Sequence, residues 1–291
     1  MSRSRARLVL HGGAGALPDR DYGPQLAHMR GLIEAGRDRL AAGAAALDVV
    51  VETIAELEAS GLYVAGRGAS PNLAGVYELD ASLMDGPSRA AGAVAALAGF
   101  ASPIRAARAV MDTTPHVLLA GAGAAAFAAA RGLEAIHDPD AWFTPVWSET
   151  EISASGSKVG TVGCLARDET GALAAGTSTG GTFCKLPGRV GDSPIPGAGV
   201  WADDTVAVSC TGEGEMFIRA AVAAQIAHRM RFGGETLAAA AQAALDEVGA
   251  LGGDGGLIAL SADGEIAMPF NSKGMKRACL DADGAITSQA F

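Results

Sequence analysis

The stretch Thr161-Val162-Gly163-Cys164-Leu165-Ala166 predicts a strand, and Ala172-Leu173-Ala174-Ala175 begins a second one. Between them, Arg167-Asp168-Glu169-Thr170-Gly171 supplies a turn. Strands joined by so short a connection pair as an antiparallel hairpin, because parallel strands need a long crossover. The hairpin therefore favours antiparallel sheets covered by helices over a parallel βαβ fold.

Upstream of the hairpin, apolar periodicity predicts further strands and helices. Leu8-Val9-Leu10 reads as a short buried strand that runs into the glycine-rich turn His11–Gly15. From Gln25 to Ala59 apolar residues recur at helical spacing, and Gly43 divides the segment into two helices. The other predicted elements are strands over Val76–Met84 and Ala90–Ala98, a helix over Pro103–Met111, and an exposed polar linker between Gly132 and Gly160.

Downstream of the hairpin the pattern again mixes the two kinds of element. It predicts a strand over Thr205–Cys210, helices over Glu215–Met230 and Glu235–Val248, and a final pair of strands over Gly256–Leu260 and Glu265–Pro269. Strands and helices in blocks, with each half contributing both, indicate a layered α+β arrangement.

Composition excludes several classes of protein. The chain has 291 residues, is 49% hydrophobic and carries a formal net charge of -10. That apolar content argues against disorder, and the negative charge argues against partners bound through phosphates, such as nucleic acid or anionic membrane. Four scattered cysteines without CxxC spacing indicate neither a disulfide scaffold nor a zinc site. With no signal-peptide h-region or membrane-spanning run, we expect a cytoplasmic protein.

Two short motifs suggest other chemistries. Gly121–Ala126 follows a strand-like run and matches the dinucleotide fingerprint G-x-G-x-x-G/A, which leaves a nucleotide-binding or oxidoreductase module as an alternative. Gly176-Thr177-Ser178-Thr179-Gly180 matches the nucleophile elbow G-x-S-x-G, but the glycine- and proline-containing segment after it cannot run as the helix that an elbow requires. The five histidines lack HxxH or HExxH spacing, so metal ligation has little support.

A third constellation places hydroxyl and charged residues next to glycines at successive strand ends. It comprises the segments Gly160–Gly163, Thr177–Gly181, Leu186–Pro194 and Ser209–Glu215. Such residues expose side chains and backbone N–H groups to a common cleft, as binding of a small charged molecule requires.

With these segments the chain resembles the plant-type L-asparaginase and isoaspartyl peptidase family of N-terminal nucleophile hydrolases. The resemblance runs from Leu8–Gly15 through Glu78-Leu79-Asp80-Ala81 and Met84-Asp85-Gly86 to Gly255–Ala259 and Pro269-Phe270-Asn271, which covers nearly the whole chain. It implies that the chain cleaves itself between Gly160 and Thr161. The new α-amino group of Thr161, with an ordinary pKa of about 7.7–8.0, can then accept the proton of the Thr161 hydroxyl, so one residue supplies both nucleophile and base.

The resemblance also implies roles for the other site residues. Thr179 hydrogen-bonds and tunes the nucleophile, while Thr211 and the N–H of Gly212 form the oxyanion hole. Arg189 holds the α-carboxylate of the substrate and Asp192 its α-ammonium group. The list of implied substrate-binding residues is Arg189, Asp192, Gly212 and Gly214.

The resemblance to the family also includes a loop that would bind sodium, and within this loop the chain differs from the family pattern at one residue. The resemblance implies a structural sodium ion bound by the backbone carbonyls of Leu57, Glu58, Ser60, Tyr63, Ala65 and Arg67, and no organic cofactor. Relatives usually read Phe-Asn-Ala-Gly in this loop, whereas this chain reads Tyr63-Val64-Ala65-Gly66. Loss of the asparagine amide leaves open a family member that binds amino acids without catalysis.

We therefore expect an α+β fold of the four-layer αββα type found in N-terminal nucleophile hydrolases. The chain would mature into residues 1–160 and 161–291, an α and a β subunit that together form one structural domain and assemble as a homodimer of such pairs. The expected reaction is hydrolysis of aspartyl β-amide bonds in isoaspartyl dipeptides, L-asparagine or both, releasing L-aspartate. Motifs shared by the family do not rank these substrates.

Overall fold

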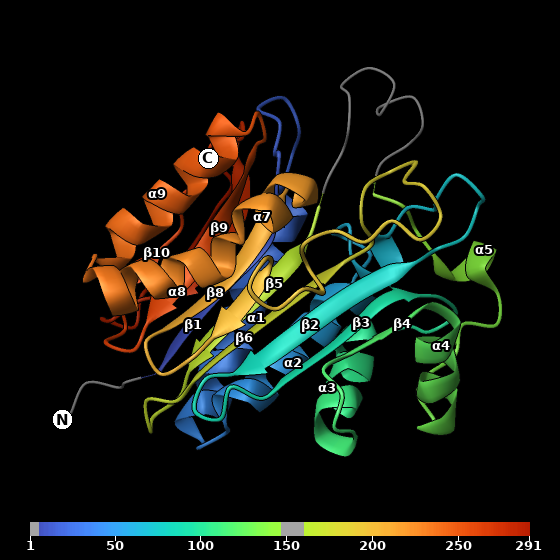
Figure 1. The fold of residues 1–291 in the computed structure, drawn as a ribbon, viewed down its shortest axis with the longest axis horizontal. Helices are drawn as coiled ribbons and strands as arrows, with labels where there is room; N and C mark the ends of the chain where they lie inside the picture. Colours follow the sequence, from blue (N-terminus) through green and yellow to red (C-terminus); the bar gives the residue numbers. More distant parts are fainter. Residues whose placement is uncertain (1–5, 147–159) are drawn as a thin grey trace.

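Strand β1 (Arg7–Ala14) lies inside the larger of two sheets in the computed structural model, which describes residues 6–146 and 160–291 (Figure 1). Leu8 and Leu10 pack on the helix side of that sheet, and Val9 packs toward the second sheet. Because both faces are covered, every residue of β1 is buried. The larger sheet is therefore an inner layer.

The larger sheet has eight strands in the order β12-β11-β1-β5-β6-β2-β3-β4, and all neighbours are antiparallel except β3 and β4. The predicted hairpin is confirmed, since β5 and β6 pair with Val162 opposite Ser178. The other strands are β2 (Leu79–Asp85), β3 (Ala91–Leu97), β4 (Leu118–Ala120), β5 (Val162–Arg167), β6 (Leu173–Thr179), β11 (Met275–Leu280) and β12 (Ile286–Gln289).

The smaller sheet packs face to face on the larger one. Its four strands, in the order β10-β9-β8-β7, are β7 (Val200–Ala202), β8 (Val206–Gly212), β9 (Gly255–Ser261) and β10 (Ile266–Ala267). Val9, Leu165 and Ala175 of the larger sheet share an apolar cluster with Val200 and Ile258 of the smaller one. This cluster forms the centre of the sandwich.

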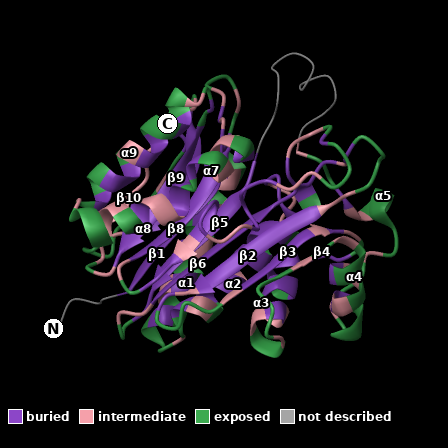
Figure 2. Cartoon of the chain, viewed as in Figure 1, coloured by how far each residue is buried: buried purple, intermediate pink, exposed green. Residues whose placement is uncertain are grey.

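Helices cover the outer face of each sheet, so the layers run α, β, β, α (Figure 1). Those on the larger sheet are α1 (Gly23–Ala41), α2 (Ala46–Ala59) and α3 (Pro103–Thr113), and those on the smaller sheet are α7 (Gly214–Ala220), α8 (Val222–Gly233) and α9 (Leu237–Ala250). Within the described residues, α4 (Gly121–Ala130) also packs on the edge of the larger sheet beside β3 and β4, and η1 (Gly66–Gly68) and α5 (Pro139–Trp142) are short helical elements. Figure 2 shows burial concentrated on the strands. The expected αββα sandwich is confirmed.

Most elements lie close to where the sequence predicts them, including the break between α1 and α2, where Gly43 has φ +90°. Among residues 6–146 and 160–291, no helix is both long and apolar enough to cross a bilayer.

Three expectations about the elements are wrong. The single helix expected over Glu215–Met230 is two helices, α7 and α8, divided at Ala221. Strands β11 and β12 follow the pair that we expected to be the last. The linker expected between Gly132 and Gly160 is not exposed throughout, because Phe143 is buried and stacks on Tyr77 with ring centroids 3.7 Å apart. Residues 147–159 of that linker lie outside the described residues.

The left-handed backbone at Ala221 (φ 48°, ψ 46°) generates a prediction about stability. A side chain in this conformation costs about 1 kcal/mol, which glycine does not incur. We expect Ala221→Gly to raise the free energy of unfolding by roughly 0.5–1 kcal/mol in chemical denaturation. Ala126→Gly, at an exposed position inside α4, is the matched control and should lower it by about 1 kcal/mol. Equal losses in both variants would contradict the assignment of strain to Ala221.

Candidate active site

The polar residues at one end of the sandwich follow from strand periodicity. Along β5, β6 and β8 every second side chain faces the space between the sheets, and Leu165, Ala175 and Ala207 occupy that face in the apolar centre. The next two residues on this face of each strand, moving toward one end of the sandwich, are Gly163 and Thr161 along β5, Thr177 and Thr179 along β6, and Ser209 and Thr211 along β8. The face thus changes from apolar residues to hydroxyls toward this end of the sandwich.

Thr161 and Thr179 lie next to each other because β5 and β6 are antiparallel neighbours. The hydroxyl of Thr179 donates a 2.6 Å hydrogen bond to the carbonyl oxygen of Gly160, the residue before Thr161. It also accepts a 2.9 Å bond from the N–H of Gly181, which fixes its direction. The carbonyl of the Gly160–Thr161 peptide is thereby polarised by a buried hydroxyl.

Next to Thr161, a chain of buried hydrogen bonds connects β1, β8 and β6. Nε2 of His11 bonds Oγ of Ser209 at 2.9 Å, and that hydroxyl bonds Oγ1 of Thr177 at 2.7 Å. The contact requires Gly163, since a Cβ there would lie 2.1 Å from Ser209 Oγ and 2.2 Å from His11 Nε2. Burial lowers the pKa of His11 to about 3, so its ring is neutral. His11 is thus a buried neutral ring in contact with the backbone of Thr161.

Arg189 and Asp192 line the same small cavity as Gly160, Thr161 and Thr179. Arg189 makes a two-pronged ion pair with Glu215, with Nε–Oε1 and Nη2–Oε2 distances of 2.8 Å each. The guanidinium therefore already binds one carboxylate in the planar geometry expected for a substrate carboxylate. The cavity has about 10 Å³ of free space, which is the volume of about one water molecule.

The carboxylate of Asp192 is buried, and its Oδ2 accepts no hydrogen bond from the described residues. Burial raises its pKa to about 7, although Arg189 acts in the opposite direction. An unsatisfied buried acceptor is costly, and an ammonium group is a donor that would satisfy it. Asp80 has a similar unsatisfied Oδ2 and lies opposite Thr179 in the β2–β6 ladder.

The predicted oxyanion residues lie at the end of β8. Gly212 lines the cavity, and the hydroxyl of Thr211 accepts a 3.1 Å bond from the N–H of Ala14. Gly214 packs against Asp192, because a Cβ at Gly214 would lie 2.9 Å from both the N and Oδ1 atoms of that residue. The structure thus brings residues from β5, β6, β8 and the loop before β7 to one end of the sandwich.

The loop proposed for sodium is a turn built from backbone contacts. The carbonyl of Leu57 accepts a bond from the Ser60 hydroxyl, and that of Arg67 accepts one from the N–H of Thr144. The carbonyls of Tyr63 and Ala65 accept bonds from N–H groups of the same loop. A carbonyl oxygen has two lone pairs, so these bonds are compatible with an ion. No cluster of three or more acidic, histidine or cysteine side chains that could hold a metal occurs in the described parts of the chain.

Val64, at the position where the family resemblance implies an asparagine, lies beside the Gly160–Thr161 bond. Its carbonyl accepts a 2.9 Å hydrogen bond from the N–H of Gly180. Its side chain packs against Gly160, where an added Cβ would lie 2.6 Å from the Cβ of Val64. Val64 therefore supplies an apolar wall next to the peptide bond predicted to be cleaved.

Glu58 is a functional-site neighbour that sequence reasoning missed, because it was considered only for its backbone carbonyl. Its buried carboxylate accepts bonds from Ser178 Oγ (2.6 Å), Ser102 Oγ (2.5 Å) and the N–H of Ile104 (3.0 Å). Burial raises its pKa to about 7. It ties α2 to the strand that carries Thr179, and a lone acidic residue in an apolar helix face is the sequence signal that could have identified it.

The elbow-like motif Gly176–Gly180 and the dinucleotide-like motif Gly121–Ala126 do not have the surroundings that their usual functions require. Ser178 lies within β6, bonded to Glu58, and is not on a strand-to-helix turn. The glycines of Gly121–Ala126 begin α4 after β4, which is an edge strand. In the part of the chain that the structure describes, no further parallel strand follows α4 to complete a dinucleotide-binding unit.

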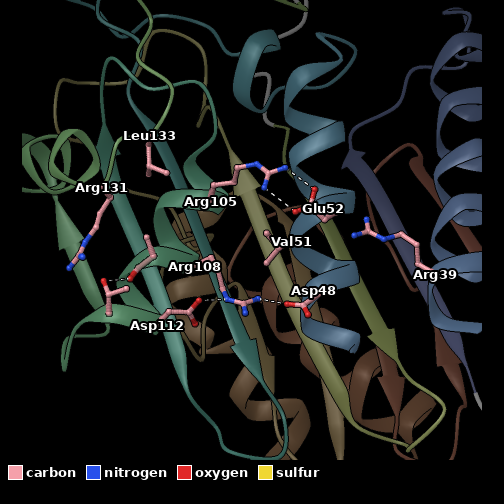
Figure 3. Close-up of a pocket in the computed structure, with 11 residues that line it drawn as sticks. Arg39, Asp48, Val51, Glu52, Arg105, Arg108, Asp112, Arg131 and Leu133 are labelled. Atoms are coloured by element: carbon pink, nitrogen blue, oxygen red, sulfur yellow. Dashed lines mark hydrogen bonds and ion pairs between the residues drawn. The ribbon is translucent and has the colours of Figure 1, made fainter. Parts of the chain in front are cut away.

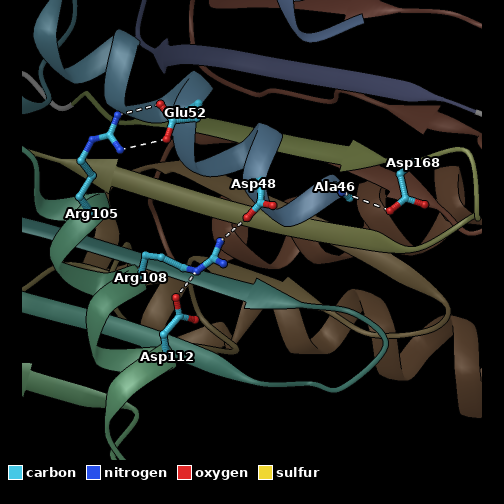
Figure 4. Close-up of polar contacts among 7 residues, drawn as sticks. All are labelled: Ala46, Asp48, Glu52, Arg105, Arg108, Asp112 and Asp168. Carbon is cyan, nitrogen blue, oxygen red and sulfur yellow. Dashed lines mark hydrogen bonds and ion pairs between the residues drawn. The ribbon is translucent and has the colours of Figure 1, made fainter. Parts of the chain in front are cut away.

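A larger cavity, of about 650 Å³, lies between α2 and α3 and not at this site (Figure 3). Arg105 pairs with Glu52, and Arg108 bridges Asp48 and Asp112 at 2.8 and 2.7 Å (Figure 4). Arg105 and Arg108 are therefore paired with carboxylates of α2 and α3, at partly exposed positions where each pair contributes little.

A sandwich with this polar end is the architecture of the N-terminal nucleophile hydrolases. A family model described as asparaginase matches residues 4–288, so the chain belongs to the asparaginase family.

Relatives match over nearly their whole length. The isoaspartyl peptidases of Salmonella typhimurium and Escherichia coli are 46% and 44% identical, over 94% of this chain and 95% and 92% of theirs. The plant-type L-asparaginase of Pyrobaculum calidifontis is 41% identical, over 93% of this chain and 95% of its own.

The raised pKa of Glu58 predicts a pH-dependent stability. The pKa rises from 4.5 to about 7 on folding, so the stability that this group contributes is full below pH 4.5 and is lost as the pH rises through 7. Glu58→Gln keeps the shape without titrating. We expect its unfolding free energy, relative to wild type, to rise by about 1 kcal/mol per pH unit between pH 5 and 7.

Chemical denaturation across this pH range measures the effect. Glu56→Gln, at an exposed position of the same helix, is the matched control and should run parallel to wild type. If the Glu58→Gln curve also runs parallel, the carboxylate does not titrate as described.

Proposed function

We propose that Thr161 is the nucleophile of an isoaspartyl peptidase and L-asparaginase that hydrolyses the β-amide bond of aspartyl substrates. One observation carries the proposal: the hydroxyl of Thr179 polarises the carbonyl before Thr161, at a cavity that Arg189 and Asp192 also line. The relatives named isoaspartyl peptidase, identical at nearly half of the aligned positions, support the same chemistry.

The first reaction is cleavage of the chain itself. The Oγ1 atom of Thr161 attacks the carbonyl carbon of Gly160, and the bond from that carbon to the nitrogen of Thr161 breaks as the nitrogen takes up a proton. Water then hydrolyses the resulting ester, which leaves the Gly160 carboxylate and a free Thr161 amine. Residues 1–160 and 161–291 are the proposed subunits. They stay together because β5 pairs with β1 across this division.

Catalysis follows on the freed threonine. The α-amine of Thr161 accepts the hydroxyl proton as Oγ1 attacks the β-carbonyl carbon of the substrate. Thr211 and the N–H of Gly212 stabilise the oxyanion, and the amine returns the proton to the leaving nitrogen. Water hydrolyses the β-aspartyl ester and L-aspartate leaves.

Arg189 and Asp192 orient the substrate in this proposal. Arg189 exchanges Glu215 for the α-carboxylate, and Asp192 accepts bonds from the α-ammonium group. The cavity is too small for an amino acid in the intact chain, so substrate binding requires Gly160 and the Arg189 side chain to move. Cleavage and substrate entry are therefore linked.

The proposal also includes a bound sodium ion and the assembly of subunit pairs into a homodimer. A sodium ion held by carbonyls of the loop from Leu57 to Arg67 would fix the backbone beside Val64, whose carbonyl bonds Gly180 next to Thr179. Pairs of subunits would form a homodimer, which light scattering of the purified protein measures.

Intact mass under denaturing conditions tests the nucleophile. The wild type should give two fragments that meet at Gly160 and Thr161, and Thr161→Ala should remain a single 29.0 kDa chain. Thr179→Val removes the donor to the Gly160 carbonyl and should slow cleavage by about 10²–10³-fold. Thr113→Val, at an exposed position of α3, is the control and should cleave at the wild-type rate.

Other outcomes identify the alternatives. A wild-type chain that stays whole on long incubation but binds L-aspartate would establish the non-catalytic family member. Tight binding of a dinucleotide by an intact chain would support a nucleotide-binding module instead.

The role of Asp192 is tested with a pair of substrates. We expect Asp192→Asn to lower kcat/KM for L-asparagine by about 10²-fold, because it removes the charged partner of the α-ammonium group. Turnover of succinamic acid, which lacks that group, should change far less. Asp204→Asn, at an exposed site, should leave both rates unchanged. Equal losses on the two substrates would argue against ammonium recognition.

A further inference from the structure

Asp80 lies beside Thr179 on the face of the larger sheet that carries the site. The two residues are directly opposite each other in the antiparallel β2–β6 ladder, where such pairs have Cβ atoms roughly 4.5–5.5 Å apart on one face. The next ladder continues the row, because Val162 pairs with Ser178 and so brings Thr161 to the other side of Thr179. A carboxyl group therefore flanks the Thr179 hydroxyl on the side away from the nucleophile.

One oxygen of this carboxyl group is available to a donor. Oδ1 of Asp80 accepts a 2.7 Å hydrogen bond from the N–H of Ala96, which holds the side chain in place. Oδ2 accepts no hydrogen bond from the described residues, although Asp80 is fully buried. A buried acceptor of this kind is costly unless a donor completes it. The sequence therefore maintains an unsatisfied oxygen next to Thr179.

Neighbouring cations favour the charged form of this group. The buried Lys185 donates a 2.6 Å hydrogen bond from Nζ to the carbonyl of Glu78, and the same Nζ would lie 2.8 Å from a Cβ added at Gly181. Burial raises the pKa of Asp80, whereas the charges of Lys185 and Arg189 lower it. An ionised carboxylate is a stronger hydrogen-bond acceptor than a neutral carboxyl group.

The proposed self-cleavage removes the present acceptor of the Thr179 proton. In the intact chain the Thr179 hydroxyl donates to the carbonyl of Gly160 and accepts from the N–H of Gly181. Once Gly160 has separated, the new α-amine of Thr161 is the adjacent polar group. A neutral amine has one lone pair, and catalysis requires that lone pair for the proton of Thr161 Oγ1. A hydrogen bond from Thr179 to the lone pair would block the base.

We infer that Asp80 is a positioning residue whose Oδ2 accepts the hydrogen bond of the Thr179 hydroxyl after cleavage. Thr179 then accepts a bond from an N–H of the Thr161 amine, and the lone pair of that amine stays free for Oγ1. No proton passes between Asp80 and Thr179. The inference rests on the proposed function, in which Asp192, the other site carboxylate with a free oxygen, binds the substrate ammonium. It makes Asp80 necessary for hydrolysis but not for self-cleavage.

Asp80→Asn tests this separation of the two reactions. Self-cleavage, followed by intact mass, should stay within about three-fold of wild type, because Thr179 bonds Gly160 in the intact chain. On the matured variant, kcat for L-asparagine should fall at least about 10-fold, as loss of one charge-assisted hydrogen bond implies. KM should stay within about two-fold, since Arg189 and Asp192 are unchanged. Asp80→Ala, which has no acceptor, should show the same pattern.

Asp85→Asn, at a partly exposed position on the other end of β2, is the matched control and should keep both wild-type rates. Self-cleavage also reports that each variant has folded. The inference is overturned if Asp80→Asn keeps the wild-type kcat, if its loss is confined to KM, or if both Asp80 variants lose cleavage and hydrolysis equally.

The wild type separates this result from failure of the proposed function. A wild type that cleaves itself and hydrolyses L-asparagine supports the proposed function whatever the Asp80 variants do. If the wild type neither cleaves itself nor hydrolyses L-asparagine or β-aspartyl-leucine, the proposed function is wrong and the role of Asp80 falls with it.

Discussion

The site depends on the absence of a side chain at Gly163. Because this residue has only hydrogen at Cα, His11 and Ser209 meet at 2.9 Å across β5, and the two sheets approach closely at the end where the hydroxyls lie. A methyl group there would overlap both side chains. The positions of Thr161, Thr179 and Thr211 relative to one another follow from that close approach and from the strand registers. The neutral ring of His11 suits this role, since a charged ring would have to be buried without a counterion.

Around this contact the molecule combines a rigid apolar centre with polar groups whose partners are incomplete. Asp80 and Asp192 each retain a buried oxygen without a hydrogen bond from the described residues, and Arg189 is satisfied by Glu215, a side chain that is itself more than half exposed. Groups of this kind reduce stability unless a ligand completes them. The rest of the fold compensates through the three apolar clusters on the faces of the two sheets.

Local patterns predicted the fold well where each element carries its own signal. The β5–β6 hairpin and the α1–α2 break were correct because a tight turn and a positive-φ glycine are local features. Strand β11 was missed because Lys276 and Arg277 are buried within it, which no apolar pattern indicates. The division at Ala221 was missed because alanine favours helix, and the non-local bonds from the N–H groups of Ala223 and Ala224 to the carbonyls of Ala198 and Gly197 leave no local signal. The roles of Thr161, Arg189 and Asp192 came from a family resemblance and stay predictions. The contacts of Glu58 depend on distances that sequence spacing does not contain.

The acidic surface has a consequence for the kinetics of encounter. An isoaspartyl dipeptide with free termini carries net negative charge, as does the protein, so the two repel each other as they approach. At physiological ionic strength that repulsion is screened beyond about 8 Å. Inside the site Arg189 offers a guanidinium that is only 16% exposed and that pairs with Glu215 until another carboxylate replaces it. Salt therefore acts mainly on how often an anionic molecule reaches the mouth of the site, whereas the partly buried Arg189, which salt screens much less, acts on how long the molecule stays.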